Sequence, residues 1–431
     1  MGHQKKPQLP LAGIRVLDLS MWFAGPMCTR LLGDMGAEVI KIEAPGHIDP
    51  WRGPVNPQLV KMQAPARNVP DRPYDANPGF NLENRNKYGI TLDLRHPRAK
   101  EIIKNLVKIS DVLVENYSPR VMPKLGLSYE TLKEINPKLV MMSLPALGST
   151  GPDKDYLAFG QTIDCMSGMA YLTGYMGEEP LLQSGLSYGD PLSGMNAAFG
   201  VVAAILRRLK SKEGIHIELS QVEGLIAFNA DSILDYTMNG RIRERMGNRD
   251  RSMSPQGTYR CQGLDNWVSI AVPSDAVWQK FREAIGHPDW TNEPRFVDAI
   301  GRYANQDEID KLIEAWTLQY NHYQVMNILQ AAGVPAGPVL DAEELLAEPH
   351  LNARGYYEKM PHKVAGTYRE IAPFALFSKT PLHIRMPAPG FGEHNHYIFG
   401  ELLGMTDEEM EMLKKENIIS DTPLEKQQGS M

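Results

Sequence analysis

Asp190 is the residue whose surroundings point most directly to chemistry. It lies in the segment SYGDPLSG at residues 187–194, and small and apolar residues follow it as far as Leu206. A carboxylate at the mouth of a buried helix, with glycines that leave space around it, can attack a thioester as a nucleophile. The segment alone also fits a structural role, because Asp followed by Pro is a common helix start, with Asp as the N-cap and Pro at the first helical position.

The first 150 residues alternate between strand-like and helix-like segments. The expected strands cover residues 14–19, 37–43, 90–94, 111–116 and 138–144, and the expected helices 27–35 and 97–109. This alternation is typical of βαβ units and predicts a mainly parallel sheet, whose ligands would bind at the carboxyl ends of the strands. The glycines after the first strand lack the spacing GxGxxG, so the sequence does not support a dinucleotide site.

The remaining segments predict further elements and a second domain. A region rich in Pro, Asn and Asp at 46–77 is expected to be a long loop. The expected elements after Asp190 are a helix to Lys210, a strand at 215–219, a helix at 221–238, a hairpin within 258–272, a Pro/Gly-rich hinge at 333–344 and a helical tail from Thr406. The composition changes near Gly247, where a smaller second domain is expected to begin.

Composition limits the class of protein. With 431 residues, 42% hydrophobic and 23% charged, the chain is expected to be globular, with two domains or one domain with a large insertion. Its net charge of −7 has no long block of either sign, which argues against nucleic acid or a membrane as partner. The longest apolar stretch, near 194–206, is too short for a membrane span, and the N-terminus lacks a secretory signal.

Three cysteines bear on the redox compartment. Cys28, Cys165 and Cys261 are far apart in the sequence and have no CxxC spacing. Neither a disulfide framework nor a zinc site is therefore expected, and a reducing compartment fits best. The predicted location is the cytoplasm.

Short motifs occur in a fixed order between about Leu11 and Leu413. They are LAGIRVLDL (11–19), AGP (24–26), GAEVIKIE (36–43), NK (86–87), LDL (92–94), VENY (114–117), GD (189–190), GVPAGP (333–338) and GEH (392–394). Each motif is weak by itself. Together, their order and spacing resemble the class III CoA-transferase family, which includes formyl-CoA and crotonobetaine/carnitine CoA-transferases.

The resemblance implies that Asp190 is the catalytic residue. Its carboxylate would attack an acyl-CoA thioester to give an acyl-aspartyl anhydride and CoA thiolate, and the thiolate would convert the anhydride to an aspartyl-CoA thioester. An incoming acid would reverse the sequence and leave as a new acyl-CoA. The implied ligands are therefore CoA esters as substrates, with no permanently bound cofactor and no metal.

The resemblance also assigns residues to the CoA site. Arg95 and Lys124 are implied as phosphate contacts, and Asn116 as a neighbour of the pantetheine or adenine path. Leu92 lies in the LDL motif just before Arg95 and is placed in the same site. The alternative interpretation of the two cations is solvated surface charge.

Aromatic residues after the first strand distinguish this chain from formyl-CoA transferase. Trp22 and Phe23 are candidates for the active-site wall, although isolated aromatic residues are more often part of a core. Phe23 stands where formyl-CoA transferase has glutamine, and Ala44 where it has arginine, so a small polar acid such as formate or oxalate is not expected. In place of that enzyme's glycine-rich lid the chain has residues 252–257, whose Gln256 and Gly257 are candidates to cover the site.

The family architecture implied by the resemblance is an α/β fold in an interlocked dimer. A Rossmann-like large domain with a mainly parallel sheet would be formed by residues 1–220 together with a return segment, 333–431. A linker helix and a smaller α+β domain would occupy residues 221–332.

Three functions remain open at this point. The leading one is transfer of CoA from a donor such as succinyl-CoA to a substituted succinate such as benzylsuccinate. An α-methylacyl-CoA racemase is the second, but the position where racemases carry Gly-His-Asp holds Ala158, Phe159 and Gly160. The third is one subunit of a heteromeric transferase, so the expected partners are a second copy or a related subunit.

Overall fold

The computed structural model describes residues 8–63, 70–180 and 187–424, and the chain divides into two compact units. The first unit combines Met1–Met169, Leu182–Leu234 and Ala353–Met431, so segments far apart in the sequence build it together. The second unit contains Ala170–Leu181 and Asp235–Asn352. All residues assigned above to catalysis or CoA binding belong to the first unit.

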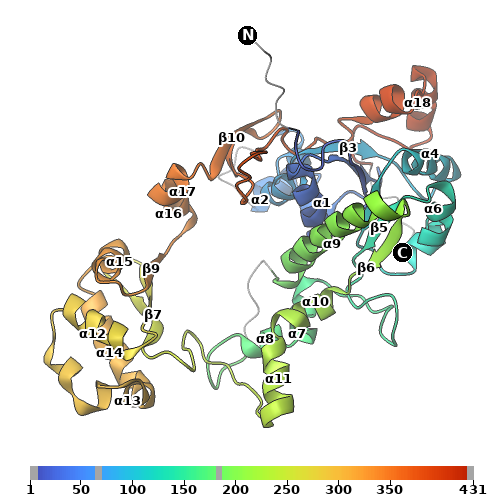
Figure 1. Cartoon of the computed structure of the whole chain (residues 1–431). Coiled ribbons are helices and arrows are strands. Elements are labelled where there is room, and N and C mark those ends of the chain that lie inside the picture. Colours follow the sequence, from blue (N-terminus) through green and yellow to red (C-terminus); the bar gives the residue numbers. More distant parts are fainter. Residues whose placement is uncertain (1–7, 64–69, 181–186, 425–431) are drawn as a thin grey trace. The chain divides into compact units, whose positions relative to one another are not determined.

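A six-stranded parallel sheet is the scaffold of the first unit (Figure 1). Its strands are β1 (Arg15–Asp18), β2 (Glu38–Glu43), β3 (Lys87–Thr91), β4 (Val112–Glu115), β5 (Val140–Ser143) and β6 (Ile215–Glu218). The spatial order is β3-β2-β1-β4-β5-β6, and every neighbouring pair is parallel. This is the strand order of the doubly wound Rossmann fold, so the predicted α/β fold is confirmed. The order reverses between β1 and β4, where such sheets bind their ligands.

Helices follow most of the strands in the first unit. They are α1 (Ala24–Asp34), α2 (Pro57–Gln63), α3 (Pro78–Asn84), α4 (Pro97–Lys108), α5 (Val121–Leu125), α6 (Tyr129–Ile135), α7 (Gly160–Met166), α9 (Gly189–Ser211), α10 (Gln221–Phe228) and α18 (Asp407–Lys415). A π-helical segment, η5 (His396–Leu402), and an antiparallel pair, β10 (Tyr357–His362) and β11 (Gly366–Ile371), complete the segment after residue 353.

Both faces of the parallel sheet are buried, because successive strand residues point into two different apolar layers. Val16 and Val39 belong to a layer filled from the other side by α1 and α9. Leu17 and Ile40, the next residues along the same strands, belong to a layer filled by α4, α6 and α18. The sheet is therefore held rigidly, and the loops at its carboxyl edge start from fixed positions.

Helix α9 is the longest helix that carries a predicted site residue. It has 23 residues with a mean hydropathy of 1.2 in its most apolar window, so by length and composition alone it could cross a membrane. It extends past the apolar stretch expected near 194–206 at both ends. It packs closely on α1 (Figure 1), since a Cβ added at Gly194 would lie 2.7 Å from the Cβ of Met27. One face of α9 therefore belongs to the core of the first unit, while 39% of its apolar window is buried in total.

The second unit has its own core around an antiparallel sheet of order β7-β8-β9. Its strands are β7 (Gln256–Arg260), β8 (Trp267–Ala271) and β9 (Ala336–Val339). Its longer helices are α12 (Asp275–Ala284), α13 (Ala299–Ala304), α14 (Gln306–Thr317), α15 (His322–Ala331) and α16 (Ala342–Ala347), while α8 (Met169–Leu172), α11 (Ala230–Asn239) and α17 (Pro349–Ala353) cross the unit boundaries. The predicted hairpin is confirmed.

Several segments differ from the sequence expectation. The helix expected at 221–238 is divided into α10 and α11, and the hinge expected at 333–344 contains β9. The region 46–77 contains a helical turn, η1 (Pro50–Arg52), helix α2 and a second turn, η2 (Pro73–Asp75). Asp49 and Asn56, followed by prolines, cap the first two of these, so residues that mark loops also start short helices. Gln256 and Gly257 lie in β7, paired with Ala271 and Ile270, and not in an irregular lid loop.

Candidate active site

Asp190 lies in the first turn of α9 and does not cap it. The helix begins at Gly189, the N-cap position is Tyr188, and no side chain bonds there. The Asp190 Oδ2 atom accepts a hydrogen bond from the hydroxyl of Ser187 at 3.1 Å. Its other oxygen, Oδ1, has no hydrogen-bond partner among the described residues. The N-cap interpretation of this residue is therefore wrong, and one carboxylate oxygen is available for other contacts.

The turn before α9 rests directly on helix α7. A Cβ added at Gly160 would lie 2.4 Å from Asp190 Oδ2 and 2.1 Å from Ser187 Oγ, and one added at Gly189 would lie 2.6 Å from a methyl of Ile163. The Asp164 Oδ1 atom accepts a hydrogen bond from the Gly189 N–H at 3.2 Å. Two glycines thus allow α7 and the turn to touch, and they fix the position of the Asp190 carboxylate.

Burial sets the protonation of Asp190. It raises the pKa of Asp190 from 3.8 to about 6, the hydrogen bond from Ser187 lowers it, and the negative charge of Asp164 adds to the increase. Asp190 is therefore mostly ionised at neutral pH and mostly protonated below about pH 6. Among the described residues no group of three or more His, Cys, Asp or Glu side chains could hold a metal ion.

The loop after β1 is held by buried charged and polar side chains. Asn116, just past β4, accepts a hydrogen bond from the Met21 N–H at 2.9 Å and donates one to the Met21 carbonyl at 2.7 Å. Asp49 accepts a hydrogen bond from the Trp22 N–H at 3.2 Å and forms a fully buried ion pair with Lys41 at 2.9 Å. The loop at the β1–β4 reversal is thus fixed at successive residues.

Trp22 and Phe23 point to different surroundings. Trp22 has φ of 65°, a left-handed conformation that is strained for an aromatic residue, and its ring meets Phe159 edge-on with centroids 5.5 Å apart. Phe159 precedes Gly160, so this aromatic pair adjoins Asp190. The ring of Phe23 instead stacks on Trp51 at 5.3 Å. Trp22 thus adjoins the turn at Asp190, whereas the half-buried ring of Phe23 packs on Trp51, and the assignment of both to the site stays a prediction.

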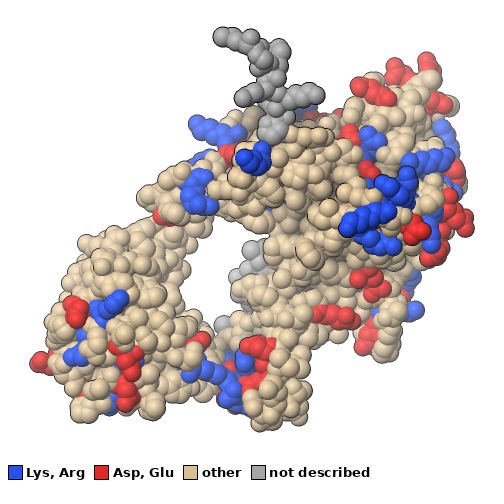
Figure 2. Space-filling view, in the orientation of Figure 1, with Lys and Arg blue, Asp and Glu red and all other residues tan. Residues whose placement is uncertain are grey.

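A basic pocket of about 590 Å³ lies near the carboxyl ends of β3 and β4. Its lining residues are Arg95, Lys100, Arg120, Val121, Lys124 and Leu125, so the structure brings together the two cations assigned to phosphate binding. Arg95 is paired with Asp93 at 2.7 Å, whereas Lys100, Arg120 and Lys124 form no ion pair within the described part of the chain. Acidic and basic side chains otherwise alternate around α4 and α6 (Figure 2). This pocket can therefore receive anionic groups without first breaking several ion pairs.

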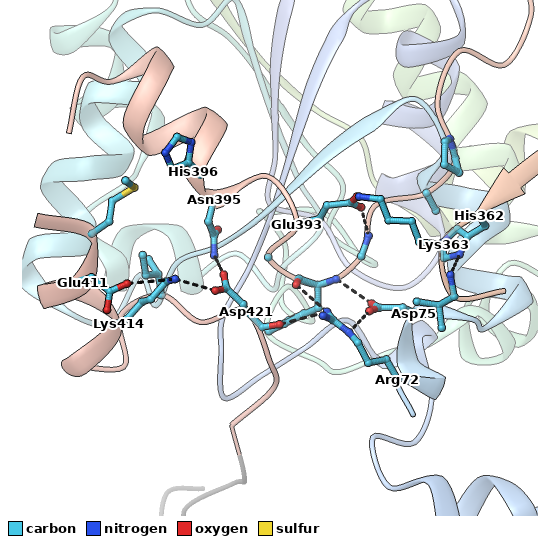
Figure 3. Close-up of a pocket in the computed structure, with 18 of the residues that line it drawn as sticks. Arg72, Asp75, His362, Lys363, Glu393, Asn395, His396, Glu411, Lys414 and Asp421 are labelled. Atoms are coloured by element: carbon cyan, nitrogen blue, oxygen red, sulfur yellow. Dashed lines mark hydrogen bonds and ion pairs between the residues drawn. The ribbon is translucent and has the colours of Figure 1, made fainter. Parts of the chain in front are cut away.

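A second pocket of about 590 Å³ has a different electrostatic character (Figure 3). Its cations already face carboxylates: Arg72 pairs with Asp75 at 2.7 Å and Lys414 pairs with Asp421 at 2.8 Å. Lys363 likewise pairs with Glu393. An incoming phosphate would have to displace these carboxylates, so this pocket is poorly suited to a phosphorylated ligand.

The remaining predicted CoA residues have structural contacts. Leu92 is buried in the layer between the sheet and α4, and its N–H bonds to the Glu43 carbonyl at 2.7 Å. Both polar atoms of the Asn116 side chain are engaged by the loop after β1. The assignment of Leu92 and Asn116 to the CoA site stays a prediction. The buried side chain of Leu92 could act there only by supporting neighbouring residues.

Sequence reasoning missed four residues near these sites. Ser187 and Asp164 contact the turn at Asp190, and Lys100 and Arg120 share the basic pocket with Arg95. Ser187 stood in the motif that contains Asp190, and Arg120 lies four residues before Lys124, so their spacing was a usable signal. The sequence contains no such signal for Asp164, because an acidic residue in a short helix is ordinarily exposed.

Comparisons with known proteins agree with the fold and with the family resemblance of the motifs. The chain matches the family described as CoA-transferase family III over residues 11–395. It is 34% identical to a succinyl-CoA–D-citramalate CoA-transferase from Chloroflexus aurantiacus, over 97% of this chain and 100% of the relative. It is 29% identical to the beta subunit of a succinyl-CoA–L-malate CoA-transferase from the same organism, over 95% of this chain and 98% of the relative.

Solved structures show the same relationship. A CAIB/BAIF family protein from Brucella suis superposes with a TM-score of 0.80 at 29% identity, over 92% of this chain and 100% of that one. The family resemblance of the sequence motifs is confirmed by these matches, and the chain belongs to CoA-transferase family III.

Proposed function

We propose that this CoA-transferase moves CoA from succinyl-CoA to a substituted succinate, with Asp190 as the covalent nucleophile. The observation that carries the proposal is the environment of Asp190: burial raises its pKa to about 6, Ser187 holds Oδ2, and Oδ1 has no hydrogen bond within the described residues. A carboxylate with this pKa is still ionised at neutral pH and is more basic than an ordinary aspartate. It is therefore a better nucleophile.

The proposed chemistry exchanges oxygen and sulfur at three carbonyl carbons, those of the donor, of Asp190 and of the acceptor. Asp190 Oδ1 bonds to the thioester carbon, the carbon–sulfur bond breaks, and the electron pair leaves with the CoA thiolate. The thiolate then attacks the aspartyl carbonyl of the anhydride, which releases succinate and leaves an aspartyl-CoA thioester. The acceptor carboxylate attacks that thioester, and the thiolate finally attacks the acceptor's carbonyl to form the new acyl-CoA and free Asp190. No step needs a net proton transfer.

The basic pocket supports a site for the phosphates of CoA. Arg95, Lys100, Arg120 and Lys124 gather within one cavity near the carboxyl edge of the sheet that also positions the Trp22 loop. Charge-assisted hydrogen bonds to phosphate are among the stronger polar contacts in proteins. We therefore place the nucleotide end of CoA in this pocket.

Arg95→Ala is expected to raise the KM for succinyl-CoA by about tenfold and to change kcat little, because the lost contact binds substrate and transition state equally. The measurement is a steady-state comparison with succinyl-pantetheine, which lacks the phosphates and should show no difference between variant and wild type. Lys414→Ala, in the pocket whose cations are already paired, serves as the control. An equal loss of turnover with both donors at saturation would contradict a positioning role.

The proposed substrates follow from the relatives and from the aromatic pair. Both named relatives use succinyl-CoA, and their acceptors, D-citramalate and L-malate, are substituted succinates. The exposed rings of Trp22 and Phe159, next to the Asp190 turn, support an acceptor with an apolar substituent such as benzylsuccinate. A small acid such as formate or oxalate carries no apolar substituent that could contact these two rings.

A panel of acids tests this assignment with succinyl-CoA as donor and the new CoA ester detected by mass spectrometry. Transfer is expected to malate, methyl-substituted malates or benzylsuccinate at a rate at least about tenfold above that to formate or oxalate, the scale expected when one apolar contact separates two substrates. Trp22→Ala should reduce the preference for the apolar acceptor most. Equal transfer to oxalate, or none to any succinate, would overturn the substrate class.

We also propose a cytoplasmic enzyme that works as a dimer or with a related subunit. Its cysteines are unpaired, and α9 exposes Phe199, Leu206 and Leu209, apolar side chains that a second subunit would cover. The similarity to a beta subunit supports the heteromeric alternative. The described surroundings of Asp190 do not favour a racemase, since Ser187 donates a hydrogen bond to its carboxylate, Asp164 acts on it by charge, and neither can act as the histidine of that reaction.

A further inference from the structure

Asp164 is a buried carboxylate that the chemistry above does not use. It lies on α7 with only 4% of its surface exposed. Its Oδ1 accepts the hydrogen bond from the Gly189 N–H, and Gly189 immediately precedes Asp190. Buried carboxylates are ordinarily paired with a cation. No cation pairs with Asp164 among the described residues, so the energetic cost of burying it calls for another explanation.

We propose that Asp164 is a positioning residue for acyl transfer: it fixes the turn that presents Asp190, and its negative charge favours the acylated over the free carboxylate. The proposal rests on the proposed role of Asp190 as nucleophile. Three observations along α7 support it: a Cβ at Gly160 would collide with the Asp190 carboxylate, a Cβ at Gly189 would collide with Ile163, and Asp164 accepts a hydrogen bond from the backbone of the same turn. A shift of Asp164 would break its hydrogen bond to the backbone of that turn.

The charge argument follows from the bonds that form and break. Before the reaction, the negative charge of Asp164 acts on the Asp190 carboxylate, and no cation pairs with either group among the described residues. When Asp190 bonds to the thioester carbon, its negative charge leaves with the CoA thiolate and the resulting anhydride is neutral. The repulsion from Asp164 then disappears, which favours the acyl-enzyme. Burial raises the pKa of Asp164 itself, while backbone N–H groups of Gly189 and Tyr188 lower it.

Other charged groups nearby are engaged elsewhere or exposed. The titratable groups on the elements packed against α7 and the start of α9 include Arg30 and Asp34 on α1, Glu223 on α10 and Tyr188 beside the turn. Arg30 and Asp34 form ion pairs with Glu83 and Arg85, and Glu223 and Tyr188 are exposed. Asp164 is therefore the charged group in the described residues that acts on the Asp190 carboxyl.

The first test is the pH profile of kcat/KM for succinyl-CoA. In the wild type we expect the rate to fall below about pH 6, where Asp190 becomes protonated. Asp164→Asn keeps an oxygen that can accept the Gly189 hydrogen bond but removes the charge, so the acid limb should move down by about one pH unit, with kcat on the plateau a few-fold lower. Asp164→Ala also loses the acceptor and should lower kcat further while KM changes little.

Asp155→Asn is the matched control. Asp155 is exposed and precedes α7, so the variant loses the same charge without touching the turn. Its acid limb should coincide with that of the wild type. If Asp164→Asn lowers the rate equally at every pH, or if Asp155→Asn shifts the limb as far, Asp164 has only a structural role and the proposal is wrong.

A stability cycle tests the coupling without any substrate. Because the pKa of Asp190 in the folded protein, about 6, exceeds the ordinary 3.8, the fold binds this proton more tightly than the unfolded chain and loses stability as pH rises through that window. Asp190→Asn removes this loss, so its gain in Tm should be larger at pH 7 than at pH 4. The pH-dependent part of that gain should shrink in the Asp164→Asn background.

The two tests separate the two proposals. If the Tm gain of Asp190→Asn depends on Asp164 but the enzyme transfers no CoA, the Asp164–Asp190 interaction stands. Only the proposed function is then refuted. Transferase activity with no difference between the two backgrounds would refute the role of Asp164 alone. An equal Tm gain at both pH values in the wild-type background would show that Asp190 is not held in a raised-pKa state, which removes the basis of the Asp164 proposal.

Discussion

Replacing Asp190 with asparagine is expected to lower CoA transfer from succinyl-CoA by at least roughly a thousandfold, the scale seen when an enzyme loses its covalent nucleophile. Asparagine keeps the size of the side chain, but its amide does not form an anhydride with an acyl group. The fold should survive, because burial raises the pKa of Asp190 and the ionised carboxylate therefore costs the folded state stability at neutral pH. The variant should melt at or above the wild-type temperature at pH 7.

Mass spectrometry identifies the residue that carries the acyl group. Wild-type protein incubated with succinyl-CoA and then hydroxylamine should give a hydroxamate on the peptide that contains Asp190, and the asparagine variant should give none. Binding of the CoA ester should remain, because the basic pocket is untouched. Asp155→Asn, an exposed aspartate, should behave as the wild type. A hydroxamate on any other peptide, or transfer at the wild-type rate without Asp190, would contradict the proposed chemistry.

The parallel sheet was predictable because its strands carry a simple signal. Val16 and Leu17, like Val39 and Ile40, are adjacent apolar residues that serve opposite faces, so each strand appears in the sequence as an unbroken apolar run. The family motifs extended this prediction to Asp190 and to the cations Arg95 and Lys124, which the structure places in one pocket. Local patterns were enough for the sheet, whereas the catalytic role of Asp190 and the phosphate contacts of Arg95 and Lys124 stay predictions.

Contacts between distant segments were not predictable in the same way. Lys41 is fully buried in β2 because Asp49 and the carbonyl of Ser20 surround its ammonium group. The sequence shows only a charged residue inside an apolar strand, which signals a buried partner without identifying it. Asp164 is similar, since its contact with Gly189 joins residues 25 positions apart. Nothing local to either segment specifies that α7 packs against the turn before α9.

Gly160→Ala should abolish most of the activity through geometry alone. The added methyl carbon would lie 2.4 Å from Asp190 Oδ2 and 2.1 Å from Ser187 Oγ, distances that real side chains do not tolerate, so the carboxylate or α7 must move. A misplacement of about 1 Å at a reacting group can cost roughly a hundredfold in rate. Overpacking of this kind also costs about 1–3 kcal/mol of folding stability. We therefore expect kcat to fall about a hundredfold, with a lower Tm and an unchanged KM for succinyl-CoA.

Two further variants distinguish the collision of the Gly160→Ala methyl from the general effect of replacing a helical glycine with alanine. Gly224→Ala makes the same change in α10, where the nearest atom would be 3.9 Å away, so it should leave activity unchanged and stabilise the helix by about 0.5–1 kcal/mol. Ser187→Gly removes the hydroxyl and the Cβ nearest to the added methyl, so in combination with Gly160→Ala it should restore part of the lost turnover. Full activity of Gly160→Ala alone would mean that the Asp190 carboxylate does not need the position that α7 gives it. A loss that Ser187→Gly leaves unrelieved would place the damage in the remaining collision with Asp190 Oδ2 or in α7 itself.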